Sequence, residues 1–270
     1  MARKVIIHAG FHKTGTTSVS RFMRQNRQVL APHAAVLLNG GARDLIQATR
    51  GYSRSRDPIT MMQIEFRLER LLTSLNAPRE RRVFLCIEEI SGLLPGLPGD
   101  GDLEEVADYG AAPALAAIVA EVCQRALTGP LEVTFYYSTR DPAAWLNSVY
   151  WQHVKAQHMT EDRDDFVERF RGAVDFDALL GEIADAVPGC RVAHETLERS
   201  SEMEFGPVTP ILDLMDLAAP LRARLAPTPP ANRGLGRAAR EEMLALNRAG
   251  LEKADLKARK QALEKQRDKR

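Results

Sequence analysis

Short apolar runs rich in β-branched and aromatic residues recur along the chain, and they predict the strands of a buried sheet. The first, Val5-Ile6-Ile7, follows two basic residues and indicates a central parallel strand. Later runs end in charged or turn-forming residues, and the spacing between runs is long enough for helices. The predicted strands cover residues 5–7, 82–87, 131–138 and 190–193.

Between these runs, apolar residues recur at the spacing of amphipathic helices. The first predicted helix begins at Thr16 or Thr17, either of which can cap it, and ends at about Gln28. The next begins at Pro58 and carries its apolar face through ITMMQIEFRLERLLTSL. Further helices are predicted over residues 112–127, 142–156, 163–171, 177–187, 207–225 and 236–249, with a helical or frayed tail after Gly250. Residues 31–57 have a mixed pattern that predicts irregular structure.

The alternation of strands and helices predicts an α/β fold of three layers, in which a central parallel sheet is flanked by helices. No internal repeat is visible, and Gly and Pro interrupt the pattern only locally, so we expect one domain over residues 1–230. Three prolines, the last of them Pro230, then break the chain before a helical C-terminal extension over residues 231–270. The end of this extension is expected to be a solvated helix or a disordered tail.

The composition is that of an ordinary globular protein, with 27% charged and 44% hydrophobic residues. A chain of 270 residues can bury a stable core without disulfides or a structural metal. The formal net charge of +1 gives no reason to expect nucleic-acid binding. The three widely spaced cysteines, at positions 86, 123 and 190, indicate reduced and mostly buried thiols. No signal-peptide pattern and no run of about 20 apolar residues is visible, so we expect a cytoplasmic protein without a membrane span.

The first strand leads into a loop that almost matches a nucleotide-binding P-loop, in the stretch VIIHAGFHKTGTTSVSRFM. Gly10 and Gly15 occupy the two glycine positions of G-x-x-x-x-G-K-[ST]. Thr16 stands where the lysine of that motif belongs, and the lysine lies inside the loop at Lys13. The geometry around a bound anion must therefore differ from that of a triphosphatase.

A strand that enters a glycine loop opening a helix can bind an anion, because backbone N–H groups and the helix dipole converge there. Lys13 adds a full positive charge, and no acidic side chain occurs in residues 1–24. Hydroxyl donors are supplied by Thr14, Thr16, Thr17 and Ser18. The alternative is a Gly/Thr turn into a helix that binds no ligand.

The stretch H-A-G-F-H-K-T-G-T-T-S closely resembles the 5′-phosphosulfate loop of sulfotransferases that use 3′-phosphoadenosine-5′-phosphosulfate (PAPS), particularly the bacterial members. These proteins have a P-loop-like α/β fold. The resemblance implies that PAPS is the donor substrate and that the desulfated nucleotide PAP is a product. It also implies that residues of the loop bind the 5′-phosphosulfate: Lys13, Thr14, Gly15, Thr16, Thr17 and Ser18.

A second motif of the same family appears in YYSTRDPAAWLNSVYWQ, residues 136–152. There the family binds the 3′-phosphate with an Arg at a strand end and a Ser about eight residues later, which match Arg140 and Ser148. Arg is a permanently charged, fork-shaped phosphate ligand. An Arg140–Asp141 surface turn is the alternative. Arg233 and Gly234 match part of an Arg-Lys-Gly loop that many relatives use for the same phosphate. The resemblance covers residues 4–155 well and residues 206–217 and 232–248 weakly.

The implied chemistry is in-line transfer of the sulfuryl group to an acceptor hydroxyl or amine, which depends on positioning and charge stabilisation. We expect Lys13 to stabilise the leaving phosphate oxygen, and the scheme needs no metal. Glu88 is the leading candidate for the general base, because it follows a buried strand and aligns with a Ser-Ser-Glu-like pattern of bacterial relatives. Its neighbour Glu89 and two histidines, His153 and His158, are alternatives. A solvated loop or helix cap is the structural alternative for Glu88-Glu89.

Other polar and aromatic residues near these motifs have structural explanations. His8 is expected to pack or to support the loop, and His12 lies on the loop's other flank. Stacking on adenine or acceptor is one role for Trp145, Tyr150 and Trp151, and core packing along a helix is the interpretation that we favour. The basic run EKADLKARKQALEKQRDKR suits an anionic membrane surface or a polyanionic acceptor, with a solvated helix as the alternative.

Two other functional classes stay open at this point: a kinase or NTPase with an altered P-loop, and a protein that binds PAP or PAPS without catalysis. The acceptor is a small molecule, lipid, carbohydrate or peptide. Its pocket is expected to involve residues 31–57, 92–110 and 156–175, which carry no interpretable motif. The sequence does not indicate an oligomeric state.

Overall fold

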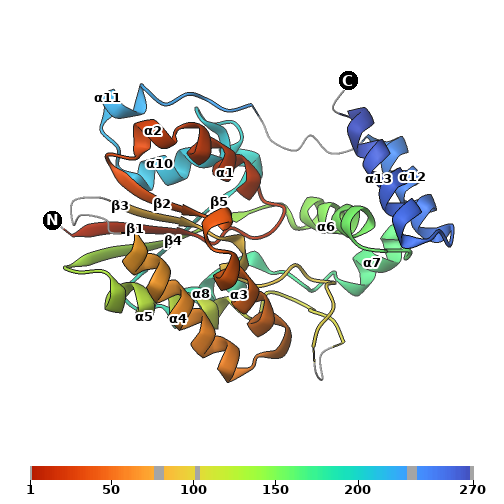
Figure 1. Ribbon diagram of the computed structural model, residues 1–270, viewed down its shortest axis with the longest axis horizontal. Helices are drawn as coiled ribbons and strands as arrows, with labels where there is room; N and C mark the ends of the chain where they lie inside the picture. The colour runs from red at the N-terminus through yellow and green to blue at the C-terminus, as the bar shows by residue number, and fades with distance from the viewer. Residues whose placement is uncertain (1, 76–81, 101–103, 230–235, 268–270) are drawn as a thin grey trace. The chain divides into compact units, whose positions relative to one another are not determined.

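A five-stranded parallel sheet forms the centre of the computed structural model, which describes residues 2–75, 82–100, 104–229 and 236–267 (Figure 1). The strands stand in the order β2-β3-β1-β4-β5. Their bounds are Arg3–His8 (β1), Ala34–Leu38 (β2), Arg82–Cys86 (β3), Leu131–Thr139 (β4) and Arg191–Thr196 (β5). Every neighbouring pair runs parallel, which confirms the predicted α/β fold with a central parallel sheet.

Helices cover both faces of this sheet, so the predicted three-layer arrangement is also confirmed (Figure 1). One face carries α1 (Thr16–Gln25), α2 (Arg27–Leu30), η3 (Gly206–Val208), α10 (Thr209–Met215) and α11 (Ala219–Arg222). The other carries α3 (Arg43–Ser55), α4 (Pro58–Ser74), α5 (Ala112–Ala126) and α8 (Phe176–Ala186). Short η1 (Asn39–Gly41), η2 (Glu88–Ser91) and α9 (Leu197–Ser200) occupy the connections.

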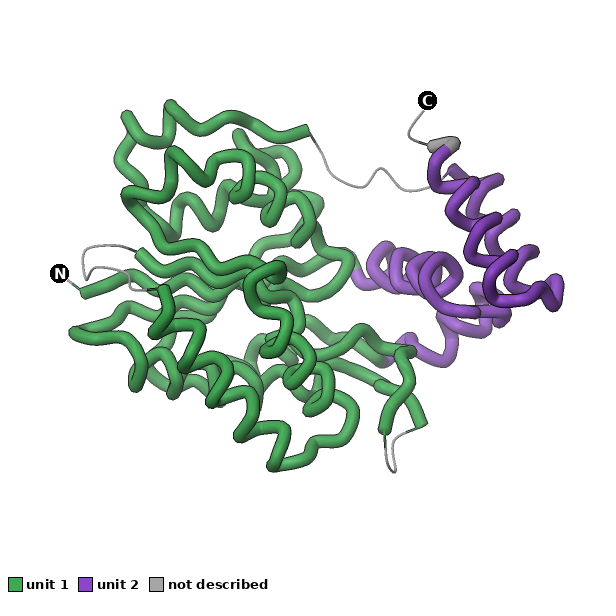
Figure 2. The backbone as a smooth tube through the Cα atoms, in the orientation of Figure 1, with its two compact units in different colours: residues 1–141, 173–231 green, residues 142–172, 232–270 purple. Residues whose placement is uncertain are grey.

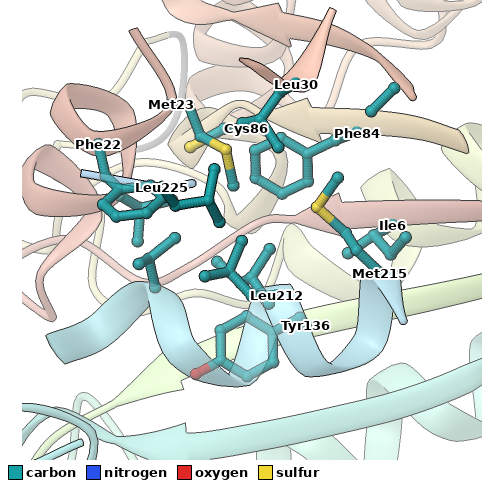
Figure 3. Close-up of a cluster of buried hydrophobic side chains, with 14 residues drawn as sticks. Ile6, Phe22, Met23, Leu30, Phe84, Cys86, Tyr136, Leu212, Met215 and Leu225 are labelled. Carbon is teal, nitrogen blue, oxygen red and sulfur yellow. The ribbon is translucent and has the colours of Figure 1, made fainter. Parts of the chain in front are cut away.

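The core on the α1 side shows why the apolar periodicity of the sequence predicts these elements (Figure 3). Phe22 and Met23 of α1 point inward with Leu212 of α10, and they meet Ile6 of β1 and Phe84 of β3. Each of these side chains is almost fully buried. Burial of one such side chain stabilises the fold by about 1.5–3 kcal/mol, so this packing holds α1 against the sheet.

The register of the central strands brings two predicted site segments to one edge. His8 ends β1 beside Cys86, which ends β3. The chain then leaves β1 through residues 9–15 and leaves β3 into η2, which begins at Glu88. In parallel α/β sheets, ligands bind outside the carboxyl ends of such strands.

The stretch 31–57, predicted to be irregular, forms β2, η1 and α3 instead. β2 has the sequence AAVLL at the edge of the sheet, where alanines weaken the strand pattern of the sequence. The predicted helix over 207–225 is divided into η3, α10 and α11, and Asp216 ends α10 in the left-handed region at φ 51°. The helix start predicted at Pro58 is confirmed, with Asp57 capping α4 by accepting a hydrogen bond from the amide of Ile59 at 3.0 Å.

The residues gather in two compact units, which Figure 2 shows in separate colours. Unit 1 comprises residues 1–141 and 173–231 and contains the sheet. Unit 2 comprises residues 142–172 and 232–270. The C-terminal segment therefore shares a unit with residues 142–172, a partnership that no local sequence pattern indicates. The domain boundary predicted between residues 230 and 231 stays a prediction.

Unit 2 is helical, and polar side chains hold its helices together. Its helices are α6 (Pro142–Ala156), α7 (Arg163–Arg169), α12 (Arg237–Arg248) and α13 (Lys253–Arg267). Lys260 of α13 donates to the carbonyl oxygens of Val154, Lys155 and Gln157 at 2.7, 3.3 and 3.0 Å. Asn247 of α12 also donates to the Val154 carbonyl, at 3.0 Å. The predicted C-terminal helices are thus present, and they cap the carboxyl end of α6. None of the described helices is both long and apolar enough to cross a membrane.

Candidate functional site

The loop between β1 and α1 has a backbone that requires glycine at two places. Gly15 has a φ of 101°, and a Cβ atom there would lie 2.8 Å from Leu197 Cδ1. A Cβ atom on Gly10 would lie 2.5 Å from His8 Nε2, so the loop can pass this ring only as glycine. Lys13 also has a positive φ, 68°, which is uncommon for a side chain of its size. The loop is therefore held in one specific conformation beside the start of α1.

The first residues of α1 present backbone donors at this loop. Gly15 is the N-cap residue of α1, not Thr16 or Thr17 as the sequence predicted, and no side-chain oxygen caps the helix. The amides of Thr16 and Thr17 have no acceptor inside the helix because they open it. Thr17 is exposed and Ser18 is half-buried. Together with Lys13, these donors make the loop attractive to an anion.

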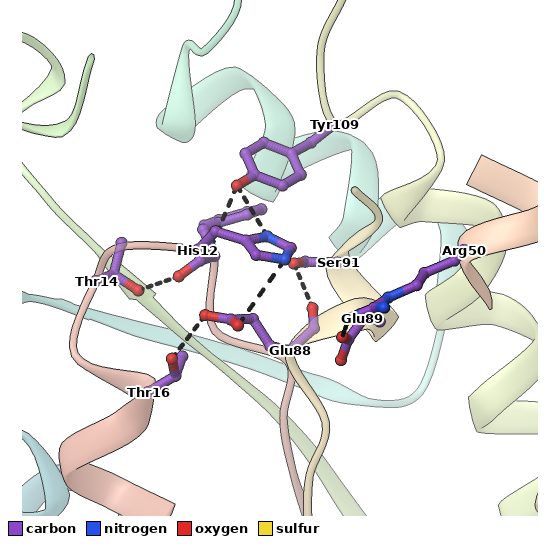
Figure 4. A network of polar contacts seen from close by, with 9 residues as sticks. His12, Thr14, Thr16, Arg50, Glu88, Glu89, Ser91 and Tyr109 are labelled. Carbon is purple, nitrogen blue, oxygen red and sulfur yellow. Dashed lines mark hydrogen bonds and ion pairs between the residues drawn. The ribbon is translucent and has the colours of Figure 1, made fainter. Parts of the chain in front are cut away.

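Thr14, one of the predicted ligand donors, uses its hydroxyl inside the loop. The side chain is fully buried, and its Oγ1 donates a hydrogen bond to the carbonyl oxygen of Phe11 (Figure 4). The hydroxyl therefore stabilises the loop turn. A role for Thr14 in ligand binding stays a prediction.

Glu88 lies at the centre of the polar network drawn in Figure 4. Its Oε1 accepts a hydrogen bond of 2.6 Å from the Thr16 hydroxyl, and the Ser91 hydroxyl donates to its backbone carbonyl at 2.8 Å. The side chain is 22% exposed, so neither a solvated loop nor a helix cap describes it. Burial raises the pKa of Glu88 to about 7, although Thr16, Lys13 and Arg50 each favour the ionised form. Glu88 can therefore exchange a proton near neutral pH beside the loop between β1 and α1.

The adjacent Glu89 has a different environment. Its side chain is 4% exposed, and Oε1 pairs with Arg50 Nη2 of α3 at 2.7 Å. The two neighbouring carboxylates point to different sides, as expected from their adjacent positions (Figure 4). A buried, paired carboxylate is less available to a substrate than Glu88, so the structure favours Glu88 between the two candidates.

His12 and Tyr109 belong to the same network, and neither was predicted as a site residue. His12 Nε2 lies 3.8 Å from Glu88 Oε2. The Tyr109 hydroxyl lies 3.2 Å from His12 Nδ1 and accepts a hydrogen bond of 3.2 Å from the His12 amide. The position of His12 next to Lys13 was a usable signal in the sequence. Tyr109 carried none, because it is far from His12 along the chain.

His8 packs inside the sheet, which is one of the two roles predicted for it. Its ring is buried, with Nε2 2.9 Å from Ser138 Oγ and Nδ1 3.3 Å from Cys86 Sγ. Burial lowers the pKa of His8 to about 3, so the ring is neutral near pH 7. Burial also raises the pKa of Cys86 to about 12, which makes this thiol a poor nucleophile. All three cysteines are free, and Cys86 and Cys123 are buried as predicted.

Arg140 lies just after β4 and reaches the loop. Its Nη1 donates to the Lys13 carbonyl at 3.3 Å, and its Nε lies 3.5 Å from Glu198 Oε1. The surface-turn alternative is therefore incomplete, because Arg140 also contacts the loop between β1 and α1. Ser148, its predicted partner, lies on α6 in unit 2, and their pairing stays a prediction. Arg233 and Gly234 lie outside the described residues.

The remaining candidate bases and aromatic residues lie in unit 2. His153 is buried, with its ring centroid 5.7 Å from that of Phe166, whereas His158 is exposed. Burial removes His153 from easy contact with a substrate, so its catalytic role has no support here. Trp145 and Tyr150 are buried, which confirms the favoured prediction of core packing for them. Trp151 is half-buried and packs edge-on against Tyr150, at 4.8 Å between ring centroids.

No group of three or more His, Cys, Asp or Glu side chains that could hold a metal ion occurs among the described residues. The donors at the loop are instead the backbone N–H groups at the start of α1 and the Lys13 cation, which suit an anionic ligand.

Comparison with solved structures gives a distant structural likeness. A crystal structure of a sulfotransferase from Alicyclobacillus acidocaldarius aligns over 96% of this chain and 96% of its own, with a TM-score of 0.44 and 15% identity. No family model and no curated protein matches the chain. A likeness this distant says nothing about activity, so the function proposed below rests on the residues of the site.

Proposed function

We propose that the protein is a PAPS-dependent sulfotransferase that transfers a sulfuryl group to an acceptor hydroxyl or amine. One observation carries the proposal: Glu88, a carboxyl group whose pKa burial raises to about 7, accepts a hydrogen bond from Thr16 at the end of the glycine loop between β1 and α1. The arrangement joins a candidate base to donors for a phosphosulfate. The sequence motif of residues 8–18 supports the same donor.

In the proposed reaction, the acceptor oxygen or nitrogen attacks the sulfur atom in line with the leaving oxygen. A bond from the acceptor to sulfur forms, the bond from sulfur to the bridging oxygen of the 5′-phosphate breaks, and PAP leaves. Glu88 takes the acceptor's proton, which requires its ionised form. Lys13 stabilises the negative charge that develops on the bridging oxygen, while the backbone amides of Thr16 and Thr17 and the hydroxyl of Thr17 hold the 5′-phosphate. The Thr16 hydroxyl keeps its hydrogen bond to Glu88. Gly15 and Ser18 complete the loop, and no residue in the scheme requires a metal.

The 3′-phosphate of PAPS is proposed to bind Arg140, with Ser148, Arg233 and Gly234 as predicted further ligands. The support is the position of Arg140 at the end of β4, where it already contacts the loop carbonyl of Lys13. Glu198 lies 3.5 Å from Arg140, so a phosphate must compete with this carboxylate for the guanidinium. We therefore expect binding of PAP to be weaker in low-salt buffer for the wild type than for Glu198→Gln.

Calorimetric titration of the purified chain with PAP, PAPS and ATP tests the donor assignment. We expect heat of binding with PAP and PAPS in the absence of Mg²⁺, and little with ATP. Binding of ATP that depends on Mg²⁺, without binding of PAP, would instead support an altered P-loop kinase. If neither PAP nor PAPS binds, the proposal is refuted.

Transfer itself is tested by incubating the protein with PAPS labelled in its sulfuryl group and a cell extract, followed by mass spectrometry. A labelled product supports catalysis and identifies the acceptor as a small molecule, lipid, carbohydrate or peptide. PAP binding without any labelled product would support the non-catalytic alternative. The cytoplasm stays the expected setting for the reaction.

A further inference from the structure

Three segments that are distant in sequence place polar side chains around one carboxylate. Glu88 comes from η2, His12 from the loop after β1, and Tyr109 from the segment before α5 (Figure 4). Glu88 Oε1 accepts the hydrogen bond from Thr16 at 2.6 Å, and Glu88 Oε2 faces His12 Nε2 at 3.8 Å. Thr16 and His12 thus contact different oxygens of the Glu88 carboxylate.

Tyr109 is placed to determine which nitrogen of His12 carries the proton. Its hydroxyl oxygen accepts from the His12 amide, and the same oxygen lies 3.2 Å from His12 Nδ1. A tyrosine hydroxyl has one proton to donate. If that proton points to Nδ1, then Nδ1 is the acceptor and the ring proton lies on Nε2, the nitrogen that faces Glu88.

Packing keeps this arrangement in place. The rings of His12 and Tyr109 stack at 16° with their centroids 6.0 Å apart. Tyr109 also packs against Phe11, with ring centroids 4.9 Å apart. The His12 side chain is 15% exposed, so water has limited access to compete for Nδ1.

We propose that Tyr109 and His12 are positioning residues for Glu88. The Tyr109 hydroxyl holds His12 as the Nε2–H tautomer, and the Nε2–H group orients the Glu88 carboxylate. The proposal deepens the sulfotransferase function and rests on it for its catalytic meaning. At 3.8 Å the contact is longer than a hydrogen bond. Catalytic contacts of this kind often shorten only when substrate is bound.

The charge states expected near pH 7 agree with this assignment. Burial lowers the pKa of His12 to about 4, so its ring is neutral and exists as one tautomer or the other. Burial raises the pKa of Tyr109 well above its usual value, so the hydroxyl keeps its proton. The other charged groups that act on this pair are Lys13 of the loop, Arg50 of α3 and Glu89 of η2.

Nitrogen NMR of the ¹⁵N-histidine-labelled full-length protein tests the tautomer directly, with His12 assigned from the His12→Gln spectrum. We expect the shifts of a protonated Nε2 and an unprotonated Nδ1 in the wild type, and loss of this pattern in Tyr109→Phe. Tyr137→Phe is the matched control, because Tyr137 also packs on Phe11, at 5.2 Å between ring centroids, but its hydroxyl makes no hydrogen bond to His12. A wild-type spectrum with the proton on Nδ1 would overturn the proposal.

Carbon NMR of ¹³C-labelled glutamate tests the effect on Glu88 without any substrate. In Tyr109→Phe, an Nδ1–H tautomer would turn the Nε2 lone pair toward the Glu88 carboxylate and disfavour its ionised form. The titration midpoint of Glu88 should rise by about half a pH unit or more. The shift should vanish when Tyr109→Phe is introduced into His12→Gln, because the glutamine has no tautomer to control. A midpoint that is the same in wild type and Tyr109→Phe contradicts the proposal.

Steady-state kinetics then separates this inference from the sulfotransferase assignment. For an active enzyme, Tyr109→Phe should lower kcat about tenfold near pH 7, shift the acidic limb of the pH profile upward and leave KM for PAPS within about twofold. A protein that fails to bind PAP, yet shows the expected tautomer and Glu88 titration, refutes the sulfotransferase assignment alone. Normal PAP binding and transfer with a Tyr109-independent pH profile refutes the positioning role alone.

Discussion

The hydrogen bond from Thr16 to Glu88 allows a quantitative prediction. The Thr16→Val substitution removes the hydroxyl that donates to Glu88 Oε1 at 2.6 Å while nearly keeping the side-chain shape. A hydrogen bond to a charged group contributes about 1.5–3 kcal/mol. One unit of pKa corresponds to about 1.36 kcal/mol, so loss of this bond should raise the pKa of Glu88 by about 1 to 2 units.

The direction follows from the charge state that the bond stabilises. The Thr16 hydroxyl favours ionised Glu88, so its removal favours the protonated carboxyl and moves the pKa upward from about 7. The ionised fraction near pH 7 would then fall from about one half to between about 10% and 1%. A reaction that needs Glu88 as the base should slow by about 5- to 50-fold near pH 7 and recover as the pH rises.

Carbon NMR titration of ¹³C-labelled glutamate measures this pKa directly, with Glu88 assigned from the spectrum of Glu88→Gln. The matched control is Ser91→Ala, because the Ser91 hydroxyl donates to the backbone carbonyl of Glu88 and not to its carboxylate. Ser91→Ala should leave the Glu88 midpoint within about 0.3 unit. A Thr16→Val midpoint equal to or below that of the wild type would show that the bond does not control the charge of Glu88.

Four further predictions follow from the same structure. Lys13→Ala should abolish sulfuryl transfer, and Arg140→Ala should raise the KM for PAPS; unchanged kinetics in both variants would contradict the donor site. Glu88→Gln should raise the Tm at about pH 8. Burial raises the folded-state pKa of Glu88 from 4.5 to about 7, so the wild type loses stability as the pH rises from about 4.5 to about 7. Thermal melts of both proteins at about pH 4 and pH 8 measure this loss. Burial lowers the folded-state pKa of His8 from 6.5 to about 3, so the wild type should lose stability as the pH falls below about 6.5. His8→Asn should flatten that part of the acid-unfolding curve, even if it lowers stability near pH 7. Lys260→Met removes the ammonium donor from the carbonyls of Lys155 and Gln157, while the Val154 carbonyl keeps its hydrogen bond from Asn247. The substitution should destabilise unit 2 by about 1–3 kcal/mol, which hydrogen exchange in α6 and α12 would detect; equal exchange in both proteins would argue against this capping role.

The elements near the sheet centre were predictable because their signals are local. β1 was predicted from Val5-Ile6-Ile7, a continuous β-branched run that is covered on both faces in the folded chain. β2 was missed because Ala34 and Ala35 have low strand propensity, and its edge position supplies pairing through β3 alone. Pairing with Arg82–Cys86 determines that strand, and the sequence of residues 34–38 does not contain this information.

The candidate site divides in the same way. Lys13, Gly15 and Thr16 were recognisable because a loop that binds an anion places its glycines, cation and hydroxyls within one short stretch of chain. Glu88 was recognisable because it follows a buried strand at the edge where ligands bind. The N-cap prediction failed at Thr16 because the hydroxyl found a stronger partner, the carboxylate of Glu88, than the amides of its own helix.

Local sequence patterns were thus sufficient to predict the alternation of strands and helices, the residue types of the loop and a candidate base. Folding alone decided that Tyr109 meets His12 and that Glu89 pairs with Arg50 while Glu88 faces the loop. It also decided that the C-terminal helices cap α6 through Lys260. The physical reason is the separation of the interacting residues along the sequence. Hydrophobic periodicity and turn preferences depend on residues close together in sequence, whereas burial, pKa and hydrogen-bond partners depend on which distant segments pack together.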